Sequence, residues 1–183
     1  MAKVIVPLAR GFEEIEAVTI IDTLRRADND VTTAGLGGTG VEGAHDIKIQ
    51  ADQRLKNINS KVFDALILPG GMPGTENLKR NSILIQLVRE FDATDRLLGA
   101  ICAAPLVLLD ADILEGRTFT SYPGFAERFT GLDYRDQRVV LDDNLITSRG
   151  PGTALEFALE LVNYLNGTDK KSQLQENMLV LSE

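Results

Sequence analysis

Cys102 is the strongest candidate nucleophile in this sequence, because a thiol loses its proton more readily than a hydroxyl group does. It lies in the segment Ala100-Ile101-Cys102-Ala103-Ala104, with small residues two positions before and two after it. This spacing is typical of a strained strand-to-helix turn that exposes a nucleophile. A lone cysteine is also often a small core residue, and the pattern alone leaves both interpretations open.

A strand-to-helix turn would give the thiol a distinctive environment. It would lie at a helix N-terminus, where free N–H groups favour the anion. A free thiol has a pKa of about 8.5, and we expect a lower value here. The same N–H groups, with those of Gly70 and Gly71, would bind an oxyanion, although a Gly-Gly pair after a strand is also an ordinary turn.

Glu16 is the candidate partner of this thiol. Three acids, Glu13, Glu14 and Glu16, begin a predicted helix, and we interpret the first two as complements to the helix dipole. Glu16 lies one turn before Ile20, beside the apolar stripe that should face the sheet. A carboxyl group held against apolar surface tends to stay protonated, and it can then donate a hydrogen bond to a thiolate.

His45 is the only histidine, and it follows Gly43-Ala44 at the start of an exposed strand. This position favours a surface or interface residue over a catalytic base. With one cysteine and one histidine, the chain has too few ligands for a structural zinc site, although carboxylate sites for hard cations are not excluded. We therefore expect no metal.

The elements that must position these residues alternate between strands and helices. Short apolar, β-branched runs predict buried strands, and apolar residues at helical spacing predict amphipathic helices. The predicted strands cover 3–8, 31–36, 62–68 and 97–101, with an exposed or edge strand at 47–51 and a β-hairpin of 138–141 and 145–148; the predicted helices start at Glu13, include 83–91, follow Pro105, and run from Gly150 to Asn166. This alternation predicts an open, mostly parallel sheet with helices on both faces.

Three loops should meet at one edge of that sheet. In open parallel sheets, ligands bind outside the carboxyl ends of the strands. The segments 11–16, 69–74 and 100–105 all follow predicted strands. The sequence therefore places the candidate residues in one crevice.

Composition limits the class of protein. The chain has 183 residues, which suits a single domain over 1–183, and its net charge of -8 opposes binding to nucleic acid. No apolar stretch is long enough to span a membrane, and the N-terminus does not look like a signal peptide. One cysteine cannot form an internal disulfide, so a cytoplasmic location is expected.

Four segments together resemble a known family. They are 11–17 (GFEEIEA), 68–71 (LPGG), 100–105 (AICAAP) and 147–153 (TSRGPGT). On these segments the sequence resembles the ThiJ/PfpI family of the class I glutamine-amidotransferase-like superfamily, in the subgroup that contains the Parkinsonism-associated protein deglycase and its bacterial relatives. The likeness covers nearly the whole chain.

The resemblance implies a flavodoxin-like three-layer sandwich without a cofactor. It makes Cys102 an oxidation-sensitive nucleophile and Glu16 its protonated hydrogen-bonding partner. Oxyanion-binding backbone would come from Gly70, Gly71 and Ala103. The subgroup usually forms homodimers through the first helix, which would place Asp22, Arg26 and His45 near the interface.

Two positions depart from the family pattern. Family proteases have a histidine directly after the cysteine, where this chain has Ala103, so peptidase activity is not expected. Other relatives carry a histidine in the loop after the next strand, where Tyr122 stands here. A neutral phenol is a poor base at neutral pH, so Tyr122 is at most an accessory residue.

The resemblance and the residues together predict a cysteine-dependent glyoxalase or deglycase of the stress response. Its substrates would be small reactive aldehydes or early glycation adducts. The alternative is a redox sensor or holdase chaperone that signals by oxidation of Cys102. A glutaminase-like or peptidase activity is disfavoured, because the chain offers no evident Cys-His-acid triad unless His45 enters from a partner.

Overall fold

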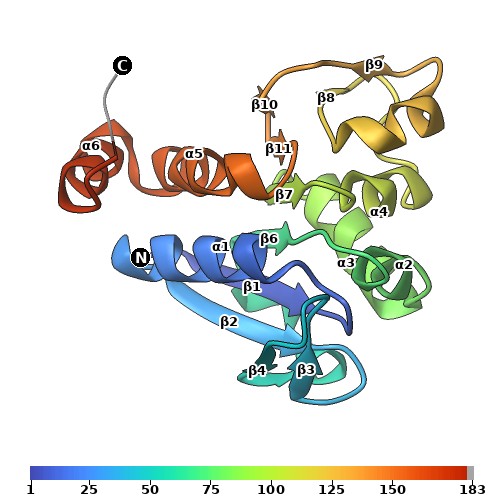
Figure 1. The fold of residues 1–183 in the computed structure, drawn as a ribbon, viewed down its shortest axis with the longest axis horizontal. Helices are drawn as coiled ribbons and strands as arrows, with labels where there is room; N and C mark the ends of the chain where they lie inside the picture. Colours follow the sequence, from blue (N-terminus) through green and yellow to red (C-terminus); the bar gives the residue numbers. More distant parts are fainter. Residues whose placement is uncertain (181–183) are drawn as a thin grey trace.

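A computed structural model of the chain, described here for residues 1–180, contains a central seven-stranded sheet with helices on both sides (Figure 1). The strands of this sheet lie in the order β10-β11-β7-β6-β1-β2-β5. In chain order the strands and α-helices are β1 (Lys3–Leu8), α1 (Glu14–Arg26), β2 (Asp30–Gly35), β3 (Gly40–Glu42), β4 (Lys48–Gln50), β5 (Gln53–Arg54), β6 (Ala65–Leu68), α2 (Gly74–Lys79), α3 (Ser82–Ala93), β7 (Leu97–Ile101), α4 (Pro105–Asp110), β8 (Thr118–Phe119), β9 (Asp133–Tyr134), β10 (Val139–Asp142), β11 (Leu145–Ser148), α5 (Ala154–Asn166) and α6 (Thr168–Asn177).

The central sheet is parallel except at one edge. In the spatial order given above, β11, β7, β6, β1, β2 and β5 each run parallel to the next strand. Only β10 runs antiparallel to its neighbour, β11. This last pair is the predicted hairpin, joined by a short turn at Asp143. The predicted mostly parallel sheet is therefore confirmed.

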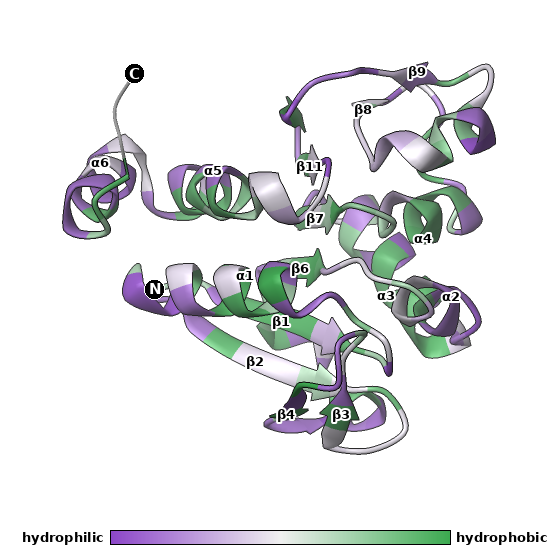
Figure 2. Ribbon diagram, viewed as in Figure 1, coloured by the Kyte–Doolittle hydropathy of each residue, from purple (hydrophilic) through white to green (hydrophobic). Residues whose placement is uncertain are grey.

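Alternating side chains of β1 show why helices cover both faces. Val4, Val6 and Leu8 join a core that includes residues of α1 and α5, whereas Ile5 joins a core that includes residues of α3 and α4. Successive side chains of a strand point to opposite faces, so a strand buried on both sides is apolar throughout. Figure 2 shows this hydrophobic centre, with the hydrophilic residues gathered on the outer sides of the helices.

Two predicted strands differ from the structure. The run 62–68 begins as a strand only at Ala65, because Ser60–Val62 forms a 3-10 turn. The run 47–51 contributes β4, which pairs with β3 in a separate antiparallel hairpin outside the central sheet. The edge of the central sheet is instead the two-residue strand β5, which is too short to show an alternating pattern in the sequence.

The β3–β4 hairpin lies against the loop that follows β1 (Figure 1). Gly11 N donates to the carbonyl of Glu42 at 2.8 Å, and Ala44 N donates to the carbonyl of Phe12 at 2.9 Å. The hairpin is therefore fixed to the loop that leads into α1.

Within residues 1–180, no helix combines the length and the apolar content that crossing a bilayer requires.

Candidate active site

Cys102 lies at the junction of β7 and α4 with a left-handed backbone, at φ +63°. Most of the other non-glycine residues with positive φ in residues 1–180 are aspartates, which tolerate this conformation in turns. Hydrogen bonds fix Cys102 on both sides: its N–H donates to the carbonyl of Ser148 at 2.9 Å, and its carbonyl accepts from Tyr122 N at 2.8 Å. The half-buried thiol thus has the backbone strain expected of a nucleophile elbow.

Gly70 makes room for the thiol and its neighbouring acid. A Cβ atom at this position would lie 2.7 Å from Cβ of Cys102 and 2.8 Å from Oε2 of Glu16. These separations are too short for carbon contacts, so no other residue fits without displacing one of the two groups. The absence of a side chain at position 70 is what lets Glu16 reach the cysteine.

Glu16 is completely buried, on the side of α1 that faces the sheet. Its Oε2 accepts a hydrogen bond from Gly70 N at 2.8 Å, while Oε1 is buried without a hydrogen-bond partner within the described residues. Burial raises the pKa of this carboxyl group to about 7, against the opposing effects of the Gly70 N–H and the thiol of Cys102. Glu16 therefore changes its protonation state near neutral pH.

The expected lowering of the thiol pKa is wrong in direction. Burial raises the pKa of Cys102, and the charge of the Glu16 carboxylate and the hydrogen bond to it raise it further. The N–H groups of Gly71 and Ala103 oppose this shift without overcoming it. The resting thiol therefore keeps its proton, and the Glu16 carboxylate is the neighbouring group that can accept it.

The structure brings the three predicted loops together. Glu13 N donates to the carbonyl of Gly70 at 2.9 Å, and Gly74 N donates to the carbonyl of Gly11 at 3.0 Å. Among the candidate oxyanion donors, the N–H of Gly70 is already used by Glu16. The N–H groups of Gly71 and Ala103 instead favour the thiolate form of Cys102. These two groups are the ones available to an oxygen atom formed beside Cys102.

Glu14 does more than complement the helix dipole, which corrects the sequence interpretation. Its side chain is buried, and its carboxylate accepts two hydrogen bonds from His45, from the backbone N at 2.6 Å and from Nδ1 at 2.8 Å. Burial by itself would raise the pKa of Glu14, but together the contacts with His45 lower it. The local sequence could not reveal this pair, because the two residues are 31 positions apart.

Glu13, Glu14 and His45 are also the one group of His, Cys or acidic side chains in residues 1–180 that is compact enough to share a metal ion. Their ligand atoms lie within 4.8 Å of one another. Because Nδ1 of His45 is already hydrogen-bonded to Glu14, we assign no metal to this group.

The remaining predicted residues lie at the periphery of the site. Tyr122 is about half exposed and lines a shallow pocket of about 260 Å³ together with Arg149 and Pro151. Asp22 and Arg26 are exposed on α1 and pair with each other, with Nε of Arg26 donating to the Asp22 carboxylate at 2.6 Å. The structure therefore brings neither Asp22 nor Arg26 to Cys102.

Comparisons with family models and with curated proteins all indicate the same family. The model of the DJ-1/PfpI family matches residues 2–164. The chain is 41% identical to Protein dj-1beta of Drosophila melanogaster over 179 residues, which is 96% of each protein. It is 39% identical to the glutathione-independent glyoxalase DJR-1.2 of Caenorhabditis elegans, over 88% of this chain and 87% of that protein. It also matches Protein DJ-1 homolog A of Arabidopsis thaliana at 41% identity over 97% of this chain, but spans only 46% of that relative's length.

Solved structures agree with the sequence comparison. Oxidized Toxoplasma gondii DJ-1 aligns with a TM-score of 0.96 at 34% identity, covering 100% of both chains. Drosophila melanogaster DJ-1beta aligns with a TM-score of 0.96 at 40% identity, covering 99% of both chains. These structures confirm the flavodoxin-like fold. The chain belongs to the DJ-1/PfpI family.

Proposed function

We propose that this chain is a cysteine-dependent glyoxalase or deglycase that acts on reactive aldehydes or their early adducts with amines and thiols. The observation that carries the proposal is the strained Cys102 beside a buried Glu16 whose pKa is about 7. A general base is most effective when its pKa lies near the working pH. The relative in Caenorhabditis elegans named a glyoxalase supports the same reaction class.

The proposed reaction begins with a proton transfer from the thiol of Cys102 to the Glu16 carboxylate. As the proton leaves, the sulfur forms a bond to the aldehyde carbon of methylglyoxal, and the former carbonyl oxygen becomes the oxygen of a hemithioacetal. The N–H groups of Gly71 and Ala103 would stabilise the negative charge on that oxygen.

Glu16 would then move a proton between the two carbons of the former oxoaldehyde. It first gives the thiol proton to the hemithioacetal oxygen, which restores its carboxylate. The carboxylate then removes the proton from the carbon bonded to sulfur and returns it to the neighbouring carbon, while the hydroxyl proton passes to the former ketone oxygen, and the product is a thioester of lactate. Water hydrolyses the thioester, so that methylglyoxal and one water give lactate and the free thiol. No external oxidant or reductant is needed.

Lactate formation from methylglyoxal tests this proposal. We expect Cys102→Ser to lower kcat/KM by at least about 10³-fold, because the hydroxyl group is a far weaker nucleophile under the same base. The melting temperature of the variant should stay close to that of the wild type. Equal rates of lactate formation in the two proteins would refute the proposal.

A redox role is the second candidate function. The two N–H groups beside the sulfur and the neighbouring acid would also hydrogen-bond the oxygens of a cysteine sulfinate. One structural neighbour is described as oxidized. Intact mass after mild peroxide would show a gain of two oxygen atoms, absent in Cys102→Ser, if Cys102 is the sensor. A wild-type mass that does not change would exclude this role.

We also propose that the chain forms a homodimer through α1. Ile15 and Val18 on α1 and Ile47 in the hairpin loop are large hydrophobic side chains, each about half exposed. Surfaces of this kind favour contact with another protein chain. Light scattering after size-exclusion chromatography would give twice the chain mass, and a variant with Val18→Glu should give a lower mass if the proposal is right.

A further inference from the structure

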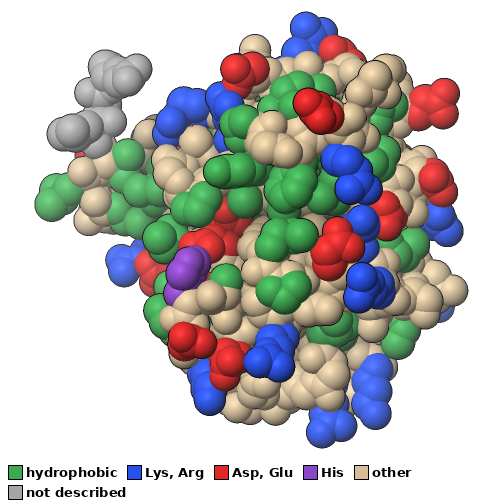
Figure 3. All heavy atoms as spheres, turned by 45° about the vertical axis from the view of Figure 1, so that its right-hand side comes forward, with side chains coloured by type: hydrophobic (Ala, Val, Ile, Leu, Met, Phe, Trp, Pro, Cys, Tyr) green, Lys and Arg blue, Asp and Glu red, His purple; other side chains and the backbone are tan. Residues whose placement is uncertain are grey.

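The tip of the β3–β4 hairpin is shaped to hold the carboxylate of Glu14. The N–H and the imidazole of His45 supply two hydrogen bonds, at 2.6 and 2.8 Å. Gly43 supplies space, since a Cβ atom there would lie 2.2 Å from Oε1 of Glu14. The side chain of Glu14 is 5% exposed and that of His45 is 68% exposed, so a buried acid meets an imidazole open to solvent. Figure 3 shows this imidazole at the surface with acidic side chains beside it.

This contact is joined to the active site by a short series of groups. Nδ1 of His45 lies 3.7 Å from Oε2 of Glu13, and the N–H of Glu13 donates to the carbonyl of Gly70. Gly70 in turn donates to Glu16. The negative charge of Glu13 also acts directly on Glu16, whose pKa it raises. A charge at position 45 can therefore act on the buried acid through Glu13, whose backbone is hydrogen-bonded to Gly70, the residue that contacts Glu16.

We propose that His45 is a positioning residue, whose imidazolium holds Glu14 against the hairpin and offsets the negative charge that Glu13 directs at the Glu16–Cys102 pair. The proposal rests on the proposed function, because it concerns the same two residues, Glu16 and Cys102. It adds that His45 sets the pH at which Glu16 loses its proton. It assigns His45 no contact with substrate.

The charged groups around His45 are mostly acidic. Its hydrogen bond to Glu14 and the charges of Glu13, Glu14 and Asp46 all raise its pKa above the ordinary value. The nearby cations Arg10 and Lys48 pair instead with Glu42. His45 therefore keeps its positive charge to a higher pH than a free histidine does.

The sign of the effect follows from the charges. A cation at position 45 offsets the charge of Glu13 and lets Glu16 lose its proton at a lower pH. A neutral side chain at position 45 leaves that charge uncompensated, so Glu16 keeps its proton to a higher pH. Because the His45 side chain is mostly exposed to solvent, its charge acts through a dielectric close to that of water. A unit charge about 6 Å away then corresponds to a shift of about half a pH unit.

The experiment measures the rate at which iodoacetamide alkylates Cys102 between pH 5 and 10, followed by intact mass in the presence of EDTA. This readout does not need turnover, so it remains informative if the chain proves to have no glyoxalase activity. The wild type is compared with His45→Gln, which removes the charge, and with His45→Arg, which keeps it at every pH. Lys48→Gln is the matched control, because it removes a cation from the same hairpin without touching Glu14.

We expect the inflection near pH 7 to lie about half a unit higher in His45→Gln than in His45→Arg, with the wild type between them. Adding Glu13→Gln to His45→Gln should return the inflection toward the wild-type value, and Lys48→Gln should leave it unchanged. Coincident profiles for the two His45 variants would overturn the proposal, even if one of them melts at a lower temperature. An equal shift in Lys48→Gln would also overturn it, since the effect would then reflect net charge alone.

Discussion

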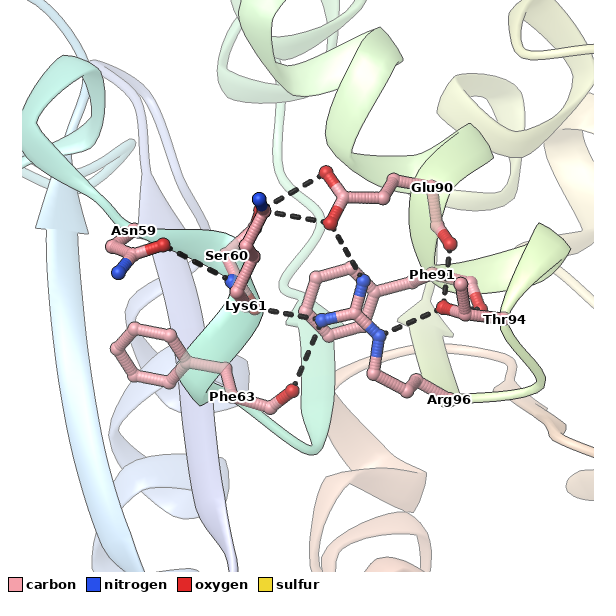
Figure 4. A network of polar contacts seen from close by, with 8 residues as sticks. All are labelled: Asn59, Ser60, Lys61, Phe63, Glu90, Phe91, Thr94 and Arg96. Atoms are coloured by element: carbon pink, nitrogen blue, oxygen red, sulfur yellow. Dashed lines mark hydrogen bonds and ion pairs between the residues drawn. The ribbon is translucent and has the colours of Figure 1, made fainter.

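Two polar clusters of this molecule, around Arg96 and around Glu16, differ in how completely their hydrogen bonds are satisfied. At the C-terminal end of α3, the guanidinium group of Arg96 lies over the ring of Phe91, with Cζ 3.8 Å from the ring centroid (Figure 4). Its nitrogens donate to two backbone carbonyls, a carboxylate and a hydroxyl group, which belong to Ser60, Phe63, Glu90 and Thr94, at 2.6 to 3.1 Å. This cluster joins the loop before β6 to the segment before β7.

The Glu16 site has the opposite character. Among residues 1–180, no group hydrogen-bonds one of the buried carboxylate oxygens, and the neighbouring Cys102 has a strained backbone. A paired polar group stabilises the fold, whereas an unpaired buried group destabilises it and remains free to react. The Arg96 cluster therefore stabilises the fold, whereas the Glu16 site lowers stability and holds the groups that we propose to be reactive.

Gly70→Ala should have the largest effect, because the new Cβ would lie 2.7 Å from Cβ of Cys102 and 2.8 Å from Oε2 of Glu16. We expect a loss of activity of about 100-fold and a decrease of about 1–3 kcal/mol in the free energy of unfolding. Gly38→Ala is the control, since a Cβ there has no atom within 4 Å. Steady-state kinetics and urea denaturation measure the two effects. Full activity in Gly70→Ala would show that the close packing of Gly70 against Cys102 and Glu16 is not needed for catalysis.

Arg96→Ala should affect stability alone. Losing the hydrogen bonds of a mostly buried guanidinium group should decrease the free energy of unfolding by about 2–4 kcal/mol. Activity per folded molecule should stay within error of the wild type. Arg96→Lys keeps the positive charge but loses the planar guanidinium group, so its free energy of unfolding should lie between those of the wild type and Arg96→Ala. A large loss of kcat in the folded Arg96→Ala variant would show that the Arg96 cluster also supports activity, and would contradict the assignment of a purely structural role.

Glu16→Gln should stabilise the protein at alkaline pH. The pKa of Glu16 is raised from 4.5 to about 7 on folding, so the contribution of Glu16 to the free energy of unfolding is fully present below pH 4.5 and is lost as pH rises through 7. Gln stays neutral throughout, and the variant should gain about 2–3 kcal/mol relative to the wild type at pH 8 compared with pH 4. Urea denaturation at both pH values gives this difference. A constant difference between the two proteins would contradict the assigned titration.

Tyr122→Phe should have the smallest effect. The Tyr122 side chain is about half exposed, and its hydroxyl group makes no hydrogen bond within the described residues. We expect kcat/KM to change by less than about twofold, as measured with methylglyoxal. A tenfold decrease would give Tyr122 the accessory role considered from the sequence.

Much of the fold could be predicted from the sequence. The apolar runs of β1 and β7 and the helical stripe of α3 are local patterns, and they lie in the structure where they were expected. Strands β5, β8 and β9 have two residues each and carry no pattern of their own. Their pairing depends on neighbours distant in the chain, which a local pattern cannot specify.

Local sequence patterns were enough to identify the candidate reactive centre: a lone cysteine between small residues after a buried strand, and an acid on the apolar side of a helix. The tertiary structure alone decided the protonation chemistry, because burial, which raises the pKa of both groups, depends on packing between distant segments. It also decided that Gly70 donates to Glu16 and that His45 binds Glu14. Such contacts join residues far apart in the chain, and only folding brings them within hydrogen-bonding distance.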